Sequence, residues 1–210
     1  MSIAFVIGNG LSRKNIDLKT LNGTTIGCNA IYRSFMPDHL VMVDERMVKE
    51  LLEVKDFTKY NKVYLQPKFK TKYNEEGLDF KEIPPGSIYG SATDSGLAAF
   101  RLAVLKRYKT IYLLGFDFAY NTSKGETNNI YAGTNGYSSY YPANKLKSSV
   151  IKLLMKECTM YKDVSFIRVI EEGVSYNFKT SHRLSFQRLP KPSNYKEITV
   201  EEFKCQHHFL

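Results

Sequence analysis

The amino-acid sequence predicts an α/β fold, with a mostly parallel sheet and helices on both of its faces. Short apolar runs rich in β-branched residues recur along the chain, and segments with helical spacing alternate with them. Most of these apolar runs end at Gly, Asn or Asp. Continuous apolar runs are typical of parallel strands that are buried on both faces. Strands that alternate with helical patterns predict parallel βαβ units.

The first predicted strand is the run IAFVI at residues 3–7, and the turn that follows contains Gly8, Asn9, Gly10 and Ser12. Glycine has no Cβ, so the backbone N–H groups of such a turn can come close to a ligand. In open α/β sheets, ligands bind at the carboxyl ends of the strands. We therefore predict a nucleotide or phosphate site at this turn. A tight turn that binds no ligand is the alternative.

The remaining elements follow from periodicity and from turn residues. Further strands are predicted at residues 24–28, 39–43, 63–65, 110–114 and 164–169, and helices at 45–54, 95–108 and 143–161. Residues 66–90 are rich in Lys, Pro and Gly and are predicted to be irregular. Residues 119–142 are rich in Tyr, Asn, Ser and Gly and are predicted to form a lid-like loop.

The length and composition are those of an ordinary globular protein. The chain has 210 residues, of which 43% are apolar and 24% charged, and this length fits one domain with a modest appendage. We expect one domain over residues 1–170 and an irregular tail over 171–210 packed on it, ending in a small element at 198–203. No apolar run reaches transmembrane length, so the expected location is the cytoplasm. Three widely spaced cysteines indicate neither a disulfide framework nor a zinc site.

Polar residues follow the ends of several predicted strands, and these ends share one edge of a parallel sheet. Asn29, Asp44 and Asp117 stand at such positions. Asp44 is a candidate binding residue, and Asp117 could hold a ribose or acceptor hydroxyl or could cap a turn. Asp94 or Ser95 could cap the helix at 95–108, whose N-terminus would offer N–H groups to an anion at the same edge.

Several motifs of nucleotide and hydrolase chemistry are absent. Arg13 stands where the third glycine of G-x-G-x-x-G belongs, which argues against a dinucleotide cofactor. The sequence has no G-x-x-x-x-G-K-[ST], no Asp-x-Asp pair, no G-x-S-x-G and no His-rich metal pattern. A standard nucleoside triphosphatase, a metal-held nucleotide sugar and a serine hydrolase of that type are therefore disfavoured. His39 opens a strand and is expected to be structural.

The net charge of +9 indicates an anionic partner. Much of the excess lies in the last third, where residues 145–196 contain eleven Lys or Arg against four Asp or Glu. A solvated helix face and attraction to a phosphorylated small molecule are the favoured interpretations. Nucleic acid is a further possible partner of this basic face and the least favoured one.

Five short motifs follow one another in order along about the first 120 residues. They are Gly8-Asn9-Gly10-x-Ser12, Ile16-Asp17, Cys28-Asn29-x-x-Tyr32, Asp94-Ser95-Gly96 and Tyr112-Leu113-x-Gly115-x-Asp117-Phe118. This ordered set resembles the bacterial lipooligosaccharide sialyltransferases of glycosyltransferase family 42. It is also similar to the wider family of flagellin-motility accessory and pterin pyrophosphokinase-like proteins.

The sialyltransferase resemblance implies a Rossmann-like domain that binds a cytidine-monophosphate sugar at this edge, without a metal cofactor. It places Asn9, Asn29 and the turn at Ser95 and Gly96 at the nucleotide, phosphate or sugar.

The resemblance also implies tyrosine hydroxyls that stabilise the leaving phosphate shortly after the Gly-x-Asp-Phe segment. Tyr120 falls near the first such position, and Tyr131 or Tyr137 could supply the second from the long loop. Hydroxyl donors aimed at developing phosphate charge lower a barrier by preorganised electrostatics.

The chain departs from these sialyltransferases at the positions of their general base and phosphate site. Asn144 stands in roughly the place of the family's catalytic histidine, and an asparagine cannot accept a proton at working pH. His182 in the basic tail is the candidate for a substitute base. Ala92 stands near the place of an expected arginine, and Asp94 replaces a neutral residue beside the phosphate site.

Three functions remain open from the sequence. The leading hypothesis is a glycosyltransferase-like protein that binds a nucleotide sugar and an unknown glycan or small-molecule acceptor, as a monomer or a homo-oligomer. The second is a pyrophosphokinase-like phosphotransferase that uses ATP and Mg²⁺, with Asp44, Asp94 and Asp117 as the metal-side groups. The third is a binding module that kept the nucleotide site and lost the base.

Overall fold

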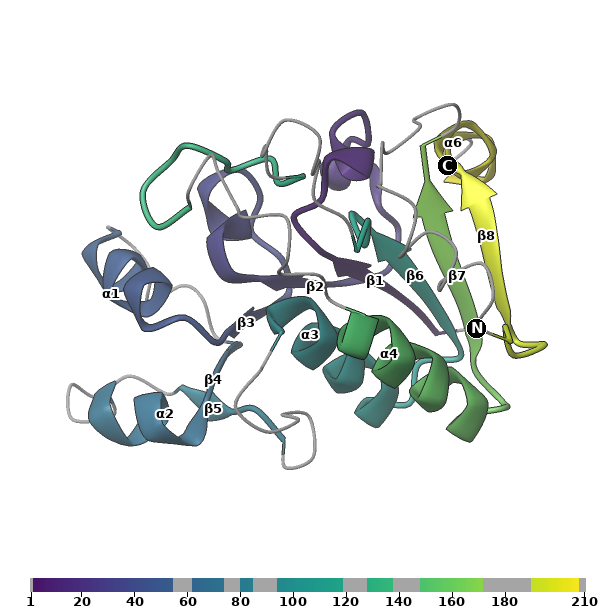
Figure 1. Cartoon of the computed structure of the whole chain (residues 1–210). Helices are drawn as coiled ribbons and strands as arrows, with labels where there is room; N and C mark the ends of the chain where they lie inside the picture. The colour runs from purple at the N-terminus through teal and green to yellow at the C-terminus, as the bar shows by residue number, and fades with distance from the viewer. Residues whose placement is uncertain are drawn as a thin grey trace.

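One parallel sheet of eight strands organises the chain in this computed structural model (Figure 1). The structure describes residues 2–54, 62–73, 80–84, 94–118, 128–137, 148–171 and 190–207. The strands are β1 (Ile3–Ile7), β2 (Thr24–Cys28), β3 (His39–Met42), β4 (Val63–Leu65), β5 (Lys81–Glu82), β6 (Thr110–Leu114), β7 (Ser165–Ile170) and β8 (Tyr195–Thr199). Their order in the sheet is β5-β4-β3-β2-β1-β6-β7-β8, and every neighbouring pair is parallel.

Helices lie on both faces of this sheet. The described α-helices are α1 (Glu45–Glu53), α2 (Pro67–Tyr73), α3 (Ser95–Leu105), α4 (Ser148–Met160) and α6 (Val200–His207). The described segments also contain three short 3₁₀ helices, η1 (Leu11–Arg13) and η2 (Leu18–Thr20) between β1 and β2, and η3 (Asn29–Arg33) directly after β2. None of the helices in the described segments is long and apolar enough to cross a membrane. The expected cytoplasmic location stays a prediction.

Strand β1 shows why the core is divided into two halves. Successive side chains of a strand point to opposite faces, so Ala4 and Val6 pack in one apolar cluster while Phe5 and Ile7 pack in the other. The first cluster contains the buried sides of α3 and α4, which Figure 1 shows across one face of the sheet. The second contains the buried sides of α1 and α6. The apolar runs of the central strands are continuous because both faces are covered.

The order of the strands reverses at the centre of the sheet. From β1 the chain builds outward through β2, β3 and β4 to β5, and then returns through α3 to place β6 on the other side of β1. The loops after β1 and β6 therefore leave the carboxyl edge in opposite directions. This point is the topological switch point, where ligands bind in open α/β sheets.

The structure confirms the predicted fold class and the predicted strands, and it is more regular than predicted in two places. Residues 66–90 include α2 and the edge strand β5. Helix α2 begins at Pro67, and proline is compatible with the first position of a helix because no intrahelical donor is needed there.

The C-terminal segment is the second such place. Strand β8 pairs with β7 from Phe166↔Tyr195 to Ile170↔Thr199, and α6 follows at once. Tyr195 and Ile198 are buried while Lys196 is exposed, which fits a strand at the edge of a sheet. The predicted boundary at residue 170 stays a prediction.

Candidate functional site

The turn after β1 packs directly against the end of β6. The backbone N–H of Gly8 donates to Leu114 O at 2.8 Å, and that of Gly10 donates to Gly115 O at 3.0 Å. A Cβ at Gly8 would lie 2.7 Å from Gly115 O, closer than atoms can approach. Gly115 itself has φ +67°, a backbone conformation that favours glycine. These contacts explain why Gly8 and Gly115 are glycines: the backbones of the two segments lie too close together for a Cβ.

Asp117 holds the same turn from the other side. Its carboxylate accepts from Ser12 N at 3.0 Å and from Asn128 Nδ2 at 3.0 Å. Asn128 Oδ1 in turn accepts from Leu11 N at 3.3 Å. The N–H groups of Gly8, Gly10, Leu11 and Ser12 are therefore bonded to protein acceptors. This arrangement matches the alternative of a tight turn rather than the predicted phosphate cradle, and it gives Asp117 the role of a turn cap.

Asn9 joins the ends of β1 and β2. Its Nδ2 donates to Cys28 O at 3.3 Å, and its Oδ1 accepts from Arg13 Nη2 at 3.3 Å. Its backbone oxygen accepts from Ile130 N at 2.9 Å. The half-buried side chain stands at the carboxyl edge between two neighbouring strands. Its hydrogen bonds join the turn to β2, to Arg13 and to the loop at 128–137.

Arg13 is a structural residue that the sequence did not reveal. Its side chain is buried, and Nε donates to Gly8 O at 2.6 Å while Nη2 donates to Tyr131 Oη at 3.3 Å. The Tyr131 hydroxyl also lies 2.6 Å from Ser34 Oγ. Tyr131 was a candidate for the leaving phosphate, but its hydroxyl is bonded within the protein and anchors the loop at 128–137. The only sequence signal was that Arg13 occupied a glycine position of a nucleotide motif.

Asn29 and Tyr137 form a polar pair after β2. Asn29 has φ +47°, and its Oδ1 accepts from Val43 N at 3.2 Å, which ties the ends of β2 and β3 together. Its side chain also hydrogen-bonds the Tyr137 hydroxyl, as does the backbone of Ala30. Burial raises the pKa of Tyr137 to about 12, and these hydrogen bonds only partly oppose the rise. The hydroxyl therefore stays protonated at neutral pH and can donate.

The first turn of α3 brings backbone N–H groups, which can bind an anion, to the same edge. Asp94 caps the helix, because its Oδ1 accepts from Leu97 N at 3.0 Å. The sequence allowed for this cap, and the structure confirms it. The half-buried Ser95 and the buried Gly96 form the first helical turn. A Cβ at Gly96 would meet Asp94 Oδ1 at 3.1 Å, so an alanine fits there after a small adjustment.

The three aspartates considered as metal-side groups each accept a hydrogen bond from the backbone N–H of a different segment. Asp44 caps α1 by accepting from Arg46 N at 3.0 Å, and it forms an ion pair with Arg46 Nη2 at 3.0 Å. Asp94 caps α3 and Asp117 caps the β1 turn. Within the described ranges, no three His, Cys, Asp or Glu side chains gather as a metal site would require.

Arg168 supports the end of β6 from β7. Its Nε donates to Phe116 O at 2.7 Å, Nη2 donates to Asp117 O at 3.4 Å, and Nη1 pairs with Glu197 Oε1 at 3.0 Å. The residue was not singled out from the sequence. An arginine inside the apolar strand Ser165–Ile170 was the available signal, because a buried charge needs specific partners.

The three predicted catalytic residues, Tyr120, Asn144 and His182, lie outside the described residues. So does most of the predicted lid-like loop at 119–142, of which residues 128–137 are described as turns fixed to Asn9 and Arg33. The structure thus brings Asn9 to the end of β2, where Asn29 and Tyr137 stand, and the start of α3 to Phe116 after β6, while the residues predicted to carry chemistry stay predictions.

An eight-stranded parallel sheet covered on both faces, with a switch point between β1 and β6, defines a Rossmann-like α/β protein. No family model and no curated protein matches the chain.

Two similar solved structures are of the sialyltransferase CstII from Campylobacter jejuni. The first, in complex with the substrate analogue CMP-3FNeuAc, has 17% sequence identity and a TM-score of 0.52, and the alignment covers 98% of each chain. The second, in complex with cytidine-5'-monophosphate, has 18% identity and a TM-score of 0.47 over 94% of this chain and 89% of that one. The first likeness shows that the fold is shared over almost the whole chain.

Proposed function

We propose that the protein is glycosyltransferase-like and binds a nucleotide-activated sugar, with a cytidine-monophosphate sugar favoured, at the carboxyl edge of its sheet. One observation carries the proposal. Asn9 bonds to the end of β2, where Asn29 and Tyr137 stand, and the first turn of α3 lies against Phe116 after β6, so all three follow strand ends on either side of the switch point.

Each of these groups has a distinct role in the proposed complex. The first turn of α3 would hold the phosphate, because helix N-termini offer N–H groups and a positive dipole end. The amides of Asn9 and Asn29 would hydrogen-bond the nucleoside or the sugar. The protonated Tyr137 hydroxyl would donate to a phosphate oxygen as negative charge develops on the leaving group.

The ordered motifs and the shared fold both support a nucleotide-sugar site. The sialyltransferase of the first similar structure was solved in complex with CMP-3FNeuAc. For the magnesium-dependent phosphotransferase, the three aspartates would have to act together, and the described contacts engage each with a different backbone N–H. The binding module without turnover shares the proposed site and differs only in its chemistry.

The first experiment is isothermal titration calorimetry with CMP-, UDP- and GDP-sugars, each with and without Mg²⁺. We expect binding of a CMP-sugar that does not depend on Mg²⁺. The variant Asn9→Asp loses the donor to Cys28 O and brings negative charge to the edge, so we expect at least a tenfold loss of affinity. The matched control is Gln206→Glu, the same amide-to-acid change at an exposed residue of α6. If no sugar nucleotide binds, the proposal fails.

A second experiment separates a transferase from a binding module. Release of CMP from the bound donor is followed with and without candidate glycan acceptors. A transferase releases CMP in an acceptor-dependent manner, whereas a binding module holds the donor unchanged. Binding that appears only with ATP and Mg²⁺ would favour the phosphotransferase instead.

A further inference from the structure

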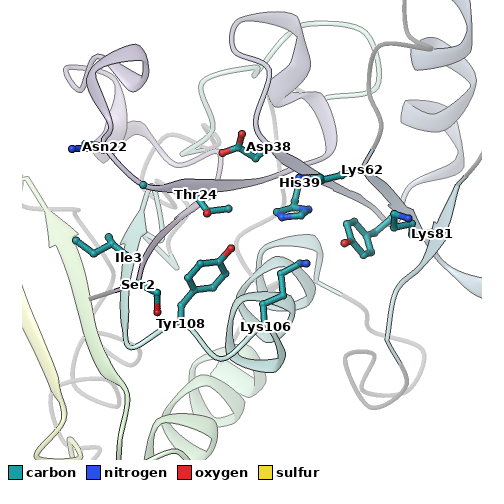
Figure 2. A pocket seen from close by; sticks show the side chains of 12 residues that line it. Ser2, Ile3, Asn22, Thr24, Asp38, His39, Lys62, Lys81, Lys106 and Tyr108 are labelled. Carbon is teal, nitrogen blue, oxygen red and sulfur yellow. The ribbon is translucent and has the colours of Figure 1, made fainter.

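A second depression lies at the amino edge of the sheet, opposite the proposed nucleotide site. Its volume is about 900 Å³, within the usual range of small-molecule pockets. Figure 2 shows it between the starts of β2 and β3 and the end of α3. The residues that line it are Ser2, Ile3, Asn22, Gly23, Thr24, Asp38, His39, Lys62, Tyr64, Lys81, Lys106 and Tyr108.

Three lysines from three different parts of the chain converge on this pocket. Lys62 precedes β4, Lys81 opens β5, and Lys106 follows α3. The carboxylate among the lining residues belongs to Asp38, whose Oδ2 accepts from Thr25 N at 2.8 Å and from Thr25 Oγ1 at 2.9 Å. The described lining thus contains three lysines and one carboxylate, and that carboxylate is hydrogen-bonded to Thr25 of β2. Such an excess attracts anions.

His39 forms part of the pocket lining and contains a buried nitrogen without a partner. The residue is 4% exposed, and its Nδ1 has no hydrogen-bond partner among the described residues. The ring packs edge-on against Tyr64, with centroids 5.6 Å apart. In Figure 2 the side chains of Lys106 and Tyr108 extend from the end of α3 toward this ring. A buried polar atom left unpaired is costly, so a ligand oxygen that moved aside the side chains over the ring and reached Nδ1 would remove that cost.

The lysines and His39 act on one another. Burial, the largest cause, and the charges of Lys106, Lys62 and Lys81 together lower the pKa of His39 to about 4, and Asp38 offsets only part of this shift. The imidazole is therefore neutral at pH 7. It can hydrogen-bond a ligand without adding charge, while the lysines supply the attraction. Burial also raises the pKa of Tyr64, so its hydroxyl remains a donor.

We propose that this pocket is a second binding site, for a small soluble molecule that carries two or more negative charges on phosphate groups. Lysine ammonium groups bind phosphate as point charges, and three of them around one depression suit a pyrophosphate or a phosphorylated metabolite better than a single carboxylate. The site lies at the opposite ends of the strands from the nucleotide-sugar site and does not depend on it.

The test uses inorganic pyrophosphate and the full chain at low ionic strength, with calorimetry as the readout. The double variant Lys62→Gln/Lys106→Gln is compared with the wild type and with Lys49→Gln/Lys152→Gln, which removes the same charge from two exposed lysines on α1 and α4. We expect the wild type and the control to bind, and the pocket variant to bind at least about tenfold more weakly. Equal affinity in all three proteins, or an equal loss in both variants, overturns the proposal.

CMP-sugar binding separates this site from the proposed function. The pocket variant should bind the CMP-sugar as the wild type does, and absence of CMP-sugar binding in every protein would leave the pyrophosphate result unaffected. Cosedimentation with phosphatidylserine vesicles distinguishes a soluble ligand from a lipid headgroup. Vesicle binding that requires Lys62 and Lys106, without binding of pyrophosphate, overturns the assignment to a soluble ligand.

A titration of the histidine ring provides a second readout. Bound pyrophosphate offsets the charges of Lys62, Lys81 and Lys106 on His39, so the pKa of His39 should rise from about 4 toward its ordinary value of 6.5. Proton NMR of the ring resonances, assigned with His39→Asn, measures this rise. An unchanged His39 titration at saturating pyrophosphate places the anion elsewhere and overturns the proposal.

Discussion

Asp117 accepts a hydrogen bond from the backbone N–H of Ser12 at 3.0 Å, across 105 residues of sequence. This contact joins the end of β6 to the turn after β1, which are the two sides of the switch point. A Cβ on Gly10 would overlap the same carboxylate and would lie 2.6 Å from Gly115 O. The geometry of the proposed site therefore depends on buried contacts between distant segments.

Replacing Gly10 by alanine should destabilise the fold. The added methyl group meets the Asp117 carboxylate and a backbone oxygen, neither of which can move without breaking hydrogen bonds. Overpacking of this kind costs about 1–3 kcal/mol, which urea denaturation would measure. Gly96→Ala is the comparison and should cost less, since its methyl group lies 3.1 Å from the capping oxygen of Asp94, which need shift only slightly, and alanine favours a helix. Equal urea midpoints for Gly10→Ala and the wild type would contradict the prediction.

Asp94 should affect stability and ligand affinity through different properties. Asp94→Ala removes the cap on Leu97 N and should lower the free energy of unfolding by about 1 kcal/mol. Asp94→Asn keeps a capping oxygen but removes a negative charge from the proposed phosphate position. We expect it to leave stability nearly unchanged and to strengthen CMP-sugar binding several-fold. Calorimetry would show the opposite if Asp94 binds a sugar hydroxyl through its charge.

The Arg33–Glu50 pair should make stability depend on pH in acid. Arg33 Nη2 and Nε lie 2.6 Å from the two oxygens of Glu50, and Arg33 also donates to Thr134 Oγ1 and Asn135 O at 2.7 Å. The hydrogen bonds from Arg33 outweigh burial and hold the pKa of Glu50 below its ordinary value of 4.5. The pair thus fixes the described part of the long loop to η3.

A folded-state pKa below the unfolded value contributes stability above about pH 4.5, and this contribution is lost as the pH falls through the folded-state pKa. We expect Glu50→Gln to be less stable than the wild type at pH 7 and to lose less stability on acidification. Urea denaturation between pH 7 and pH 3 measures both slopes. Glu53→Gln, on the same helix, is the control and should follow the wild type. Parallel slopes for Glu50→Gln and the wild type would count against this role.

The sequence predicted the sheet and the edge at which the polar groups meet, because hydrophobic periodicity and strand-end residues are local signals. It did not predict what those groups bind. Gly8 and Gly10 suggested an approach to a ligand, whereas Gly115 and Asp117 occupy the space beside them. Pairing across 105 residues leaves no local pattern.

The edge elements were missed for a related reason. Strand β5 has two residues and β8 (YKEIT) contains Lys, Glu and Thr, so neither contains the continuous apolar run that marks the central strands. The basic pocket was missed because Lys62, Lys81 and Lys106 are far apart in the sequence and each resembles an ordinary exposed lysine. Their convergence depends on the order of the strands, which the sequence alone did not provide.

Arg168 should be the most costly of the tested side chains to remove. Its guanidinium is buried between two strands, where it donates to Phe116 O at 2.7 Å and pairs with Glu197 at 3.0 Å. Burial alone would raise the pKa of Glu197, yet Arg168 and Lys191 hold it below its ordinary value. Arg168→Met would leave a largely buried carboxylate with less compensation, and breaking such a pair costs about 3–5 kcal/mol.

The control for Arg168→Met is Lys191→Met, which removes the more exposed partner of the same carboxylate, at 3.1 Å, and should cost less than about 1 kcal/mol. The double variant Arg168→Met/Glu197→Gln should recover part of the loss, because the uncompensated charge is gone, while Phe116 O stays unpaired. Urea denaturation of the wild type, Arg168→Met, Glu197→Gln and the double variant gives the coupling between Arg168 and Glu197. If Arg168→Met and Lys191→Met are equally stable, Arg168 does not support the end of β6, and the Asp117 turn must be held by Ser12 and Asn128 alone.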